Sequence, residues 1–278
     1  MRAPRRSRPR KYSKSAGSSV RLIIAIVIAL MAVVTYFTST SENPVTGEKQ
    51  RVAMTPEQEI ALGYKSAPQM AAQMGGLSQN EKARALVRQV GETLVAKSFA
   101  AKSPYKFSFH VLADARTVNA FALPGGPIFI TEGLMRQLKT EAELAGVIGH
   151  EIGHVIGRHS SERLAKQQLT QGLIGALVVG SGDFTTAQIG QMVGSMINMS
   201  YGREDELESD AFGVRIMAEA GYDPRALMRV MEVLAKASGG SRQPEFVSTH
   251  PAPENRAARI KEAIAKQFPG GVPEGLKK

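Results

Sequence analysis

The chain of 278 residues contains no cysteine. Disulfides, thiolate zinc sites, cysteine nucleophiles and lipid attachment to a thiol are therefore excluded. Acidic residues are also missing from the N-terminal stretch, because the first carboxylate along the chain is that of Glu42. Metal or acid–base chemistry has to come from the five histidines and from carboxylates beyond that point.

The excess positive charge is concentrated at the N-terminus. The formal net charge is +10, and eight positive charges fall within the first 21 residues, which leaves +2 for the remainder. A nucleic-acid-binding domain would spread such charge over a folded face. Here the charge directly precedes an apolar run, so we expect a membrane, and no nucleic acid, as the partner of this segment.

The apolar run is Leu22–Phe37, sixteen residues without a charge. It is slightly shorter than the roughly 20 residues of a spanning helix, but a snorkelling Arg21 and its neighbours extend it. We therefore expect a basic cytoplasmic tail over residues 1–19 and a transmembrane signal anchor over residues 20–38. A cleaved signal peptide is the alternative, and the absence of an Ala-x-Ala site after the run favours the anchor.

The orientation of this anchor follows from its flanking charges. The positive-inside rule keeps the arginine-rich tail in the cytoplasm and sends everything after Thr38 outward. We expect a single-pass protein of the inner membrane with its domain on the periplasmic, or extracytoplasmic, side. A second apolar stretch, Leu173–Gly180, is too short to span a bilayer. We interpret it as a buried or membrane-facing helix, with a second transmembrane pass as the less favoured alternative.

The rest of the chain divides into three parts. Residues 39–55 are predicted to be a linker and leading segment, residues 56–268 one domain, and residues 269–278 a C-terminal tail. Capping motifs and helical periodicity dominate the domain, while alternation at 105–111 and a strand–turn–strand pattern at 118–131 predict one small sheet. The expected fold class is mainly α with a small β-sheet, an α+β domain behind one transmembrane helix.

The strongest motif is His-Glu-x-x-His at residues 150–154, on a predicted helix. Residues four apart share one helix face, so His150 and His154 can hold one ion together. Glu151 can reach the water on that ion instead of the ion itself. A catalytic zinc usually has three protein ligands and a water. A third ligand is therefore needed further along the chain.

Two residues compete for the third ligand position. His159 lies one residue before the place of the third metzincin histidine, which falls on Ser160. A shift of one residue turns a side chain by about 100° round a helix, so His159 would point away from the metal. We interpret His159 as a helix C-terminal histidine favoured by the dipole. Glu206 is the better candidate, because Asp210 shares its helix face and can accept the other ring N–H of a ligand histidine. A solvated acidic helix start is the alternative interpretation of this cluster.

Five segments within residues 43–262 resemble the zinc metallopeptidase family 48, which includes HtpX-type and CAAX prenyl proteases. They are NPVTGEKQ at 43–50, the hairpin Asn119–Gly126, the metal helix at 149–160, Glu206–Asp210, and Ser248–Pro251 with Arg256 beyond it. The family usually has alanine where this chain has Ser209. The match is closest to single-span quality-control members of the bacterial periplasm and the mitochondrial inner membrane.

The resemblance implies a gluzincin-type zinc peptidase domain and assigns roles. One Zn²⁺ per subunit is expected on His150, His154 and Glu206, with Asp210 orienting a ligand histidine. Glu151 is expected to act as general base and then acid. His250 is expected to stabilise the oxyanion; a loop histidine before a proline, or a ligand that blocks a latent site, are the alternatives.

Substrate is expected to bind as an added β-strand along residues 127–131. The substrate-binding residues implied are Asn119, Ala120, Gly126, Ile128 and Arg256. Backbone pairing of this kind tolerates many sequences, which suits unfolded polypeptides. The expected function is a zinc endopeptidase for misfolded or damaged envelope proteins, with a separate repeat-protein adaptor as a possible partner.

Three other functions compete with this prediction. The first is a membrane-tethered zinc-binding chaperone or adaptor with little proteolysis, against which an intact Glu151 argues. The second is a prenyl protease, which needs several spans where only one is convincing. The third is non-proteolytic metallohydrolysis, which shares the same water chemistry.

Overall fold

The computed structural model describes residues 15–181, 201–237, 246, 250 and 255–278. The chain forms two units. The first holds helix α1 (Ser15–Thr38) and the part of helix α6 (His159–Ser181) beyond Ala165. The second holds residues 39–165 and the described residues from Tyr201 onwards.

Helix α1 carries the predicted membrane segment. Within the described part of the chain it is the one helix that is both long and apolar enough to cross a membrane, over Ser19–Thr38. Its large apolar side chains are exposed, with Ile23 at 61% and Met31 at 62%. A lipid environment satisfies such a surface. The helix gives the protein a membrane anchor.

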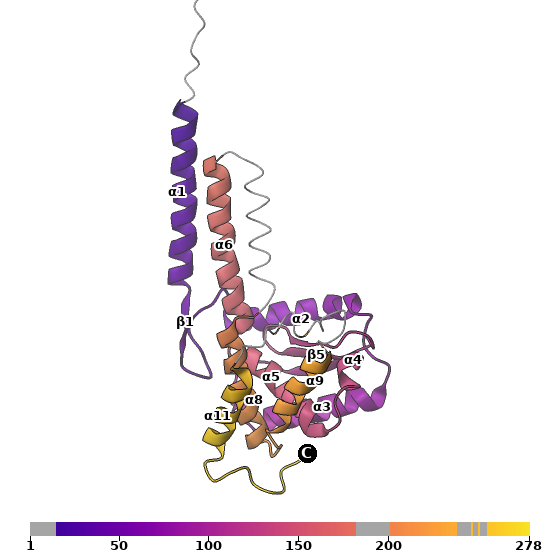
Figure 1. The fold of residues 1–278 in the computed structure, drawn as a ribbon. Helices are drawn as coiled ribbons and strands as arrows, with labels where there is room; N and C mark the ends of the chain where they lie inside the picture. The colour runs from indigo at the N-terminus through magenta and orange to yellow at the C-terminus, as the bar shows by residue number, and fades with distance from the viewer. Residues whose placement is uncertain (1–14, 182–200, 238–245, 247–249, 251–254) are drawn as a thin grey trace, which may run out of the picture. The chain divides into compact units, whose positions relative to one another are not determined.

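The second unit is mainly helical with two small sheets (Figure 1). Its helices are α2 (Pro56–Gln73), α3 (Glu81–Ala96), the short 3-10 helix η1 (Phe99–Lys102), α4 (Glu132–Met135), α5 (Glu141–Ile156), the start of α6, α8 (Arg203–Glu219), α9 (Ala226–Ala237) and α11 (Arg256–Gln267). Its strands are β1 (Thr40–Glu42), β2 (Lys49–Arg51), β3 (Ser108–Leu112), β4 (Ala120–Ala122) and β5 (Pro127–Thr131). The predicted mainly α class with a small sheet is confirmed.

The larger sheet corrects one expectation about substrate binding. Its strand order is β3-β5-β4, with β3 parallel and β4 antiparallel to β5. Strand β5, residues 127–131, is therefore paired on both sides and fully buried. A substrate strand cannot add to it, because an added strand needs an unpaired edge. The edge strands of this sheet are β3 and β4.

Helix α5 lies at the centre of the second unit. Thr140 begins it by accepting a hydrogen bond from the backbone N–H of Glu143, 3.2 Å away. Every residue from Ala142 to Ile156 is buried. Its neighbours are α3, α8, α9 and the strands β4 and β5. A helix enclosed on all sides can hold polar side chains in a fixed, water-poor environment.

Glycines allow α5 and α8 to pack closely. A Cβ atom on Gly153 would lie 2.9 Å from the backbone oxygen of Ser209, and one on Gly213 would lie 3.2 Å from the backbone nitrogen of His150. Larger side chains at these positions would separate the two helices. The close crossing brings side chains of α8 within reach of the histidines of α5.

Candidate metal centre

Helices α5 and α8 bring the three predicted ligands together. Nε2 of His150 lies 3.0 Å from Nε2 of His154 and 3.5 Å from Oε2 of Glu206. Nε2 of His154 lies 3.4 Å from Oε1 of the same carboxylate. All three side chains are buried. The i, i+4 spacing on α5 supplies the two imidazoles, and the crossing helix supplies the carboxylate.

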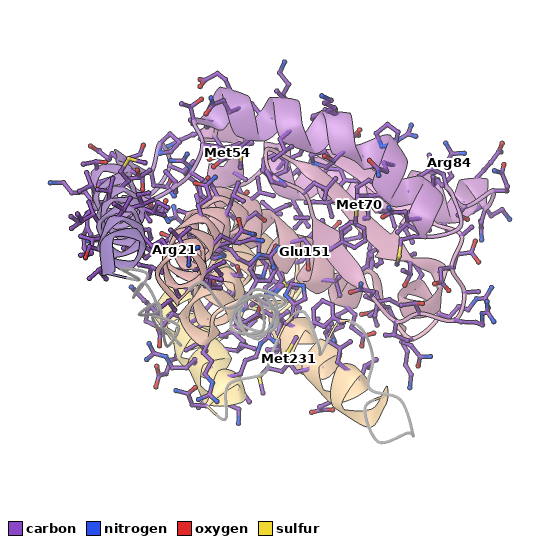
Figure 2. The ribbon with its side chains drawn as sticks, turned by 90° about the horizontal axis from the view of Figure 1, so that it is seen from above. Arg21, Met54, Met70, Arg84, Glu151 and Met231 are labelled. Carbon is purple, nitrogen blue, oxygen red and sulfur yellow. The ribbon has the colours of Figure 1, made fainter. Side chains whose placement is uncertain are left out.

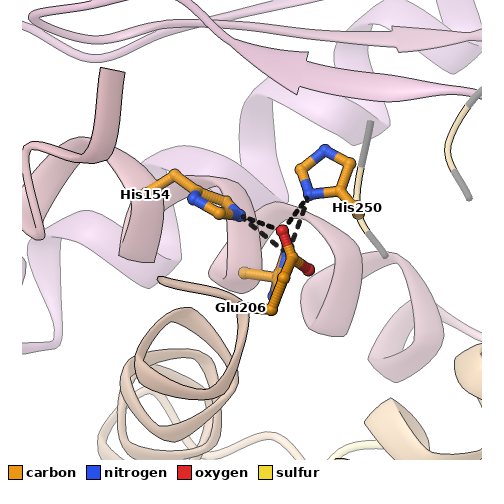
Figure 3. Close-up of side chains that lie close together, drawn as sticks. His154, Glu206 and His250 are labelled. Carbon is orange, nitrogen blue, oxygen red and sulfur yellow. Dashed lines mark hydrogen bonds and ion pairs between the residues drawn. The ribbon is translucent and has the colours of Figure 1, made fainter. Parts of the chain in front are cut away.

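His250 completes a group of four donors. Its Nδ1 lies 2.9 Å from Oε1 of Glu206 (Figure 3). The same nitrogen lies 3.4 Å from Nε2 of His150. The donor atoms of His150, His154, Glu206 and His250 all lie within 4.8 Å of one another. The interpretation of His250 as an ordinary loop histidine is therefore wrong, because it is buried at 1% exposure inside the cluster.

The spacing of these donors fits a tetrahedral metal ion. Two ligands about 2 Å from a zinc ion and at the tetrahedral angle lie about 3.3 Å apart. The five donor–donor separations given above range from 2.9 to 3.5 Å. Nitrogen and carboxylate oxygen donors are also those that zinc prefers. The residues present fit a bound Zn²⁺.

The carboxylate of Glu151 lies beside this group and makes no hydrogen bond to any described residue. Both oxygens are buried without a hydrogen-bond partner, and Oε1 lies 3.7 Å from Nε2 of His250. Glu151 is fully buried, and Figure 2 shows it near the centre of the view. Burial raises the pKa of Glu151 above its ordinary value. A buried carboxylate of raised pKa next to a metal site is suited to exchange protons with a substrate or a water.

Asp210 and Arg256 hold His150 in place. Oδ1 of Asp210 accepts a hydrogen bond from Nδ1 of His150 at 2.9 Å. Arg256 donates to both oxygens of that carboxylate, at 2.6 and 2.9 Å, and its Nη1 lies 3.2 Å from Oε2 of Glu206. With Nδ1 of His150 donating, its Nε2 presents a lone pair to the cluster. This corrects the expectation that Arg256 binds substrate, because its buried guanidinium is occupied by two carboxylates.

The family of the chain follows from comparison with known proteins. A model of peptidase family M48 matches residues 81–264. The chain belongs to this family. Peptidase family M48 consists of metallopeptidases, which depend on a metal ion.

Its relatives include two kinds of protease. The chain is 30% identical to a beta-barrel assembly-enhancing protease of Yersinia pestis over 236 residues. This aligned region is 81% of this chain and 48% of that protein. The Escherichia coli K12 protein of the same name is 30% identical over 193 residues, 66% of this chain and 39% of that one. Mitochondrial metalloendopeptidase OMA1 of Arabidopsis thaliana is 35% identical over 149 residues, 52% of this chain and 29% of that one. The chain spans less than half the length of each.

The M48 site contains one residue whose place the sequence did not indicate. His159 was interpreted as a helix C-terminal histidine, but it is the first residue of α6. Its Nδ1 lies 2.9 Å from Nδ1 of His154, and its Nε2 lies 3.0 Å from Oε2 of Glu208. A carboxylate only accepts, so Nε2 of His159 donates to Glu208 and its Nδ1 accepts from His154. The Nε2 lone pair of His154 is then free to bind the ion.

Tyr201 is a second feature that sequence reasoning missed. Its ring stacks on that of His154 with centroids 4.0 Å apart and planes 25° apart. Its hydroxyl lies 3.2 Å from Oγ of Ser160, which fixes the phenol. No local pattern marks this tyrosine, since it stands alone before the acidic helix. Its contact restricts the tilt of the ligand ring.

The predicted substrate-binding residues of the M48 site fall into two groups. Asn119 and Ala120 lie at the start of the edge strand β4, and Oδ1 of Asn119 is buried without a hydrogen-bond partner. All four residues are buried: Asn119 is 3% and Ala120 and Ile128 are each 1% exposed, and a Cβ on Gly126 would collide with the backbone of Lys106. The two pairs differ in their strands, since Ile128 lies on the central strand β5 and Ala120 on the edge strand β4, whose backbone remains a candidate for contact with substrate.

Proposed function

We propose that this protein is a zinc-dependent endopeptidase that cleaves unfolded or damaged envelope proteins on the extracytoplasmic side of the membrane that anchors it. The observation that carries the proposal is the cluster of four buried donors with an unpaired carboxylate beside it. The single anchor preceded by a basic tail supports the orientation. The relatives named as a beta-barrel assembly-enhancing protease and as mitochondrial metalloendopeptidases support a quality-control role in an envelope or organelle.

The chemistry divides between the ion and the chain. Bound to His150, His154 and Glu206, Zn²⁺ supplies a Lewis acid and a water of lowered pKa. Glu151 accepts the proton of the attacking water and delivers it to the leaving amine when the peptide bond breaks. Burial raises the pKa of Glu151, which makes its carboxylate a stronger base for the first of these transfers. No other described carboxylate stands beside the donors without a hydrogen-bond partner.

His250 has two roles in this proposal. A catalytic zinc site keeps one position open for water, and here Nδ1 of His250 takes the place of a fourth donor. We infer a resting arrangement in which His250 holds this place, and a substrate-bound arrangement in which it has left the cluster. In the described position Nε2 of His250 lies 3.7 Å from Oε1 of Glu151, and a ring released from the cluster would be able to donate a hydrogen bond to the oxyanion. The predicted stabiliser and the blocking ligand are two states of one residue.

Substrate is proposed to pair with the edge strand β4. Main-chain pairing at an edge is tolerant of side-chain sequence, which suits unfolded chains. The backbone N–H of Phe246 donates to the carbonyl of Val118, 3.3 Å away, just before β4. The ring of Phe246 stacks on that of His250, with centroids 4.3 Å apart. Withdrawal of His250 would therefore free the start of the substrate edge as well. A separate repeat-protein adaptor that delivers substrate remains part of the proposal.

Glu151→Gln tests the proposed function directly. The purified variant should keep its metal and lose hydrolysis of an unfolded protein such as casein by about 10²- to 10⁴-fold, the usual contribution of a general base. Glu141→Gln, on the same helix but outside the donor cluster, is the matched control and should stay active. Undiminished hydrolysis by Glu151→Gln would show that the water is activated in another way.

A further inference from the structure

The first unit contains two helices in close contact. A Cβ atom built on Gly172 of α6 would lie 2.5 Å from the Cβ of Ala32, and one on Gly180 would lie 3.3 Å from the Cβ of Ala25. Ala25 is 8% exposed although it belongs to the membrane anchor. Figure 1 shows this part of α6 running beside α1. Small residues at both levels permit the close approach that is typical of helix pairs in membranes.

These two contacts fix the direction and depth of α6 along α1. The later glycine of α6, Gly180, meets the earlier alanine of α1, Ala25, whereas Gly172 meets Ala32. The two helices are therefore antiparallel. The two steps are about 10 and 12 Å long at 1.5 Å per residue. Ala25 lies about 20 Å from the Thr38 end of α1, in a hydrocarbon core about 30 Å thick.

The outer surface of α6 is apolar beyond Gln171, which is its last exposed polar residue before Leu173. No charged residue follows Lys166 in the helix. Leu173 and Leu177 are 38% and 63% exposed, while Ala176 is buried. The helix thus has a buried side and an exposed leucine side over the same stretch that accompanies the anchor. A hydrocarbon environment fits both the exposed leucines and the lack of charge, because it accepts leucine side chains and excludes unpaired charges.

We propose that the part of α6 beyond Gln171 lies within the bilayer, packed on α1, with Leu173 and Leu177 facing lipid. The proposal rests on α1 as the membrane anchor. His154 and Tyr201, which precede and follow this stretch of chain, belong to one unit and stack on each other. The described residues on either side of this stretch therefore belong to the same side of the bilayer, and α6 gives the protein a second place of contact with the membrane.

Single-cysteine labelling tests the proposal in the full-length protein, which has no cysteine of its own. Membrane fragments with both faces accessible are treated with a charged, membrane-impermeant maleimide. Leu177→Cys should react at least ten times more slowly than Leu86→Cys, a matched exposed leucine on α3 of the second unit. Denaturant should abolish the difference. Equal rates would place α6 in water and overturn the proposal.

Ile26→Cys on α1 separates this failure from failure of the anchor. If Ile26→Cys is protected and Leu177→Cys reacts freely, α1 spans the membrane and α6 does not enter it. If both react freely, the anchor fails as well, and with it the proposed location of the enzyme.

A disulfide test checks the contact between the helices. Ala25→Cys with Gly180→Cys should cross-link under mild oxidation, because the Cβ separation of 3.3 Å is close to the 3.5–4.5 Å of a disulfide. Ala25→Cys with Gly175→Cys is the control, since a Cβ on Gly175 meets nothing within 4 Å. Absence of the first cross-link, or equal yields from both pairs, would contradict the pairing.

Discussion

The Nδ1 atoms of His154 and His159 lie 2.9 Å apart. Together with Glu208 they form a carboxylate–histidine–histidine chain that ends at the metal site. The other ligand histidine has a carboxylate partner of its own in Asp210, which Arg256 holds. Each imidazole of α5 is thus fixed in the tautomer that leaves its Nε2 lone pair for the ion. Outer contacts of this kind commonly control the metal affinity of a site.

Removal of His159 should weaken metal binding. His159→Ala takes away the acceptor that orients His154, and such changes typically cost about 10- to 100-fold in metal affinity. Competition with a chelator of known affinity measures this. His110→Ala, at a half-buried histidine on β3, is the control and should bind metal normally. An unchanged affinity in His159→Ala would restore the earlier interpretation, in which this histidine only ends a helix.

Replacement of Arg256 should destabilise the fold in addition to lowering activity. Arg256→Met leaves Asp210 as a buried carboxylate without its cation, and breaking a buried pair in this way costs about 3–5 kcal/mol. Urea unfolding of the metal-free protein measures the loss. Arg259→Met, an exposed arginine on the same helix, should cost at most about 1 kcal/mol. A change confined to KM would instead show that Arg256 contacts substrate.

Metal affinity should rise with pH up to about pH 9. Burial by itself lowers the pKa of His150, but hydrogen bonds and charge from Asp210 and Glu206 outweigh burial and raise the pKa to about 9. At neutral pH the metal-free protein therefore holds a proton on His150 that the ion has to displace. The apparent affinity should increase roughly tenfold per pH unit from neutrality and level off above pH 9. Calorimetry in buffers of different ionisation enthalpy should detect about one proton released at pH 7; no release would refute this assignment.

Local sequence was sufficient for part of the site. The four-residue spacing of His150 and His154 places both on one helix face, and that of Glu206 and Asp210 does the same on α8. The single long apolar run was sufficient for the anchor. These features depend on chain periodicity alone, which is why the sequence predicts them.

The remaining features depend on contacts between distant segments. Arg158 separates α5 from α6 with a φ of 59°, unusual for a residue other than glycine. Its buried guanidinium donates to Glu59 and to the carbonyl of Met54, about a hundred residues away, which holds that conformation. The break is what turns His159 back toward His154. No local sequence pattern around residue 158 predicts this break between α5 and α6.

The sheet order was hidden for a similar reason. The alternation around 105–111 and the pattern at 118–131 predict strands but not their neighbours. Strand β5 lies between β3 and β4 in the sheet, although it is the last of the three strands in the chain. Because β5 pairs on both sides, the edge proposed here for substrate is β4, one strand away from the expected place.

The crossing of α5 and α8 should be sensitive to a single methyl group. In Gly153→Ala the new Cβ would lie 2.9 Å from the backbone oxygen of Ser209, a group that cannot rotate away. Overpacking of this kind costs about 1–3 kcal/mol, against a gain of up to about 1 kcal/mol from helix propensity. The displaced α8 should also move Glu206 away from the histidines and weaken metal binding.

Gly146→Ala on the same helix is the control, because its Cβ would meet Leu227 at 3.4 Å, where the gain in helix propensity can outweigh the contact. Thermal unfolding with and without metal should show Gly153→Ala losing stability in both states and losing more with metal. Equal behaviour of the two variants would mean that the site does not depend on the closeness of this crossing.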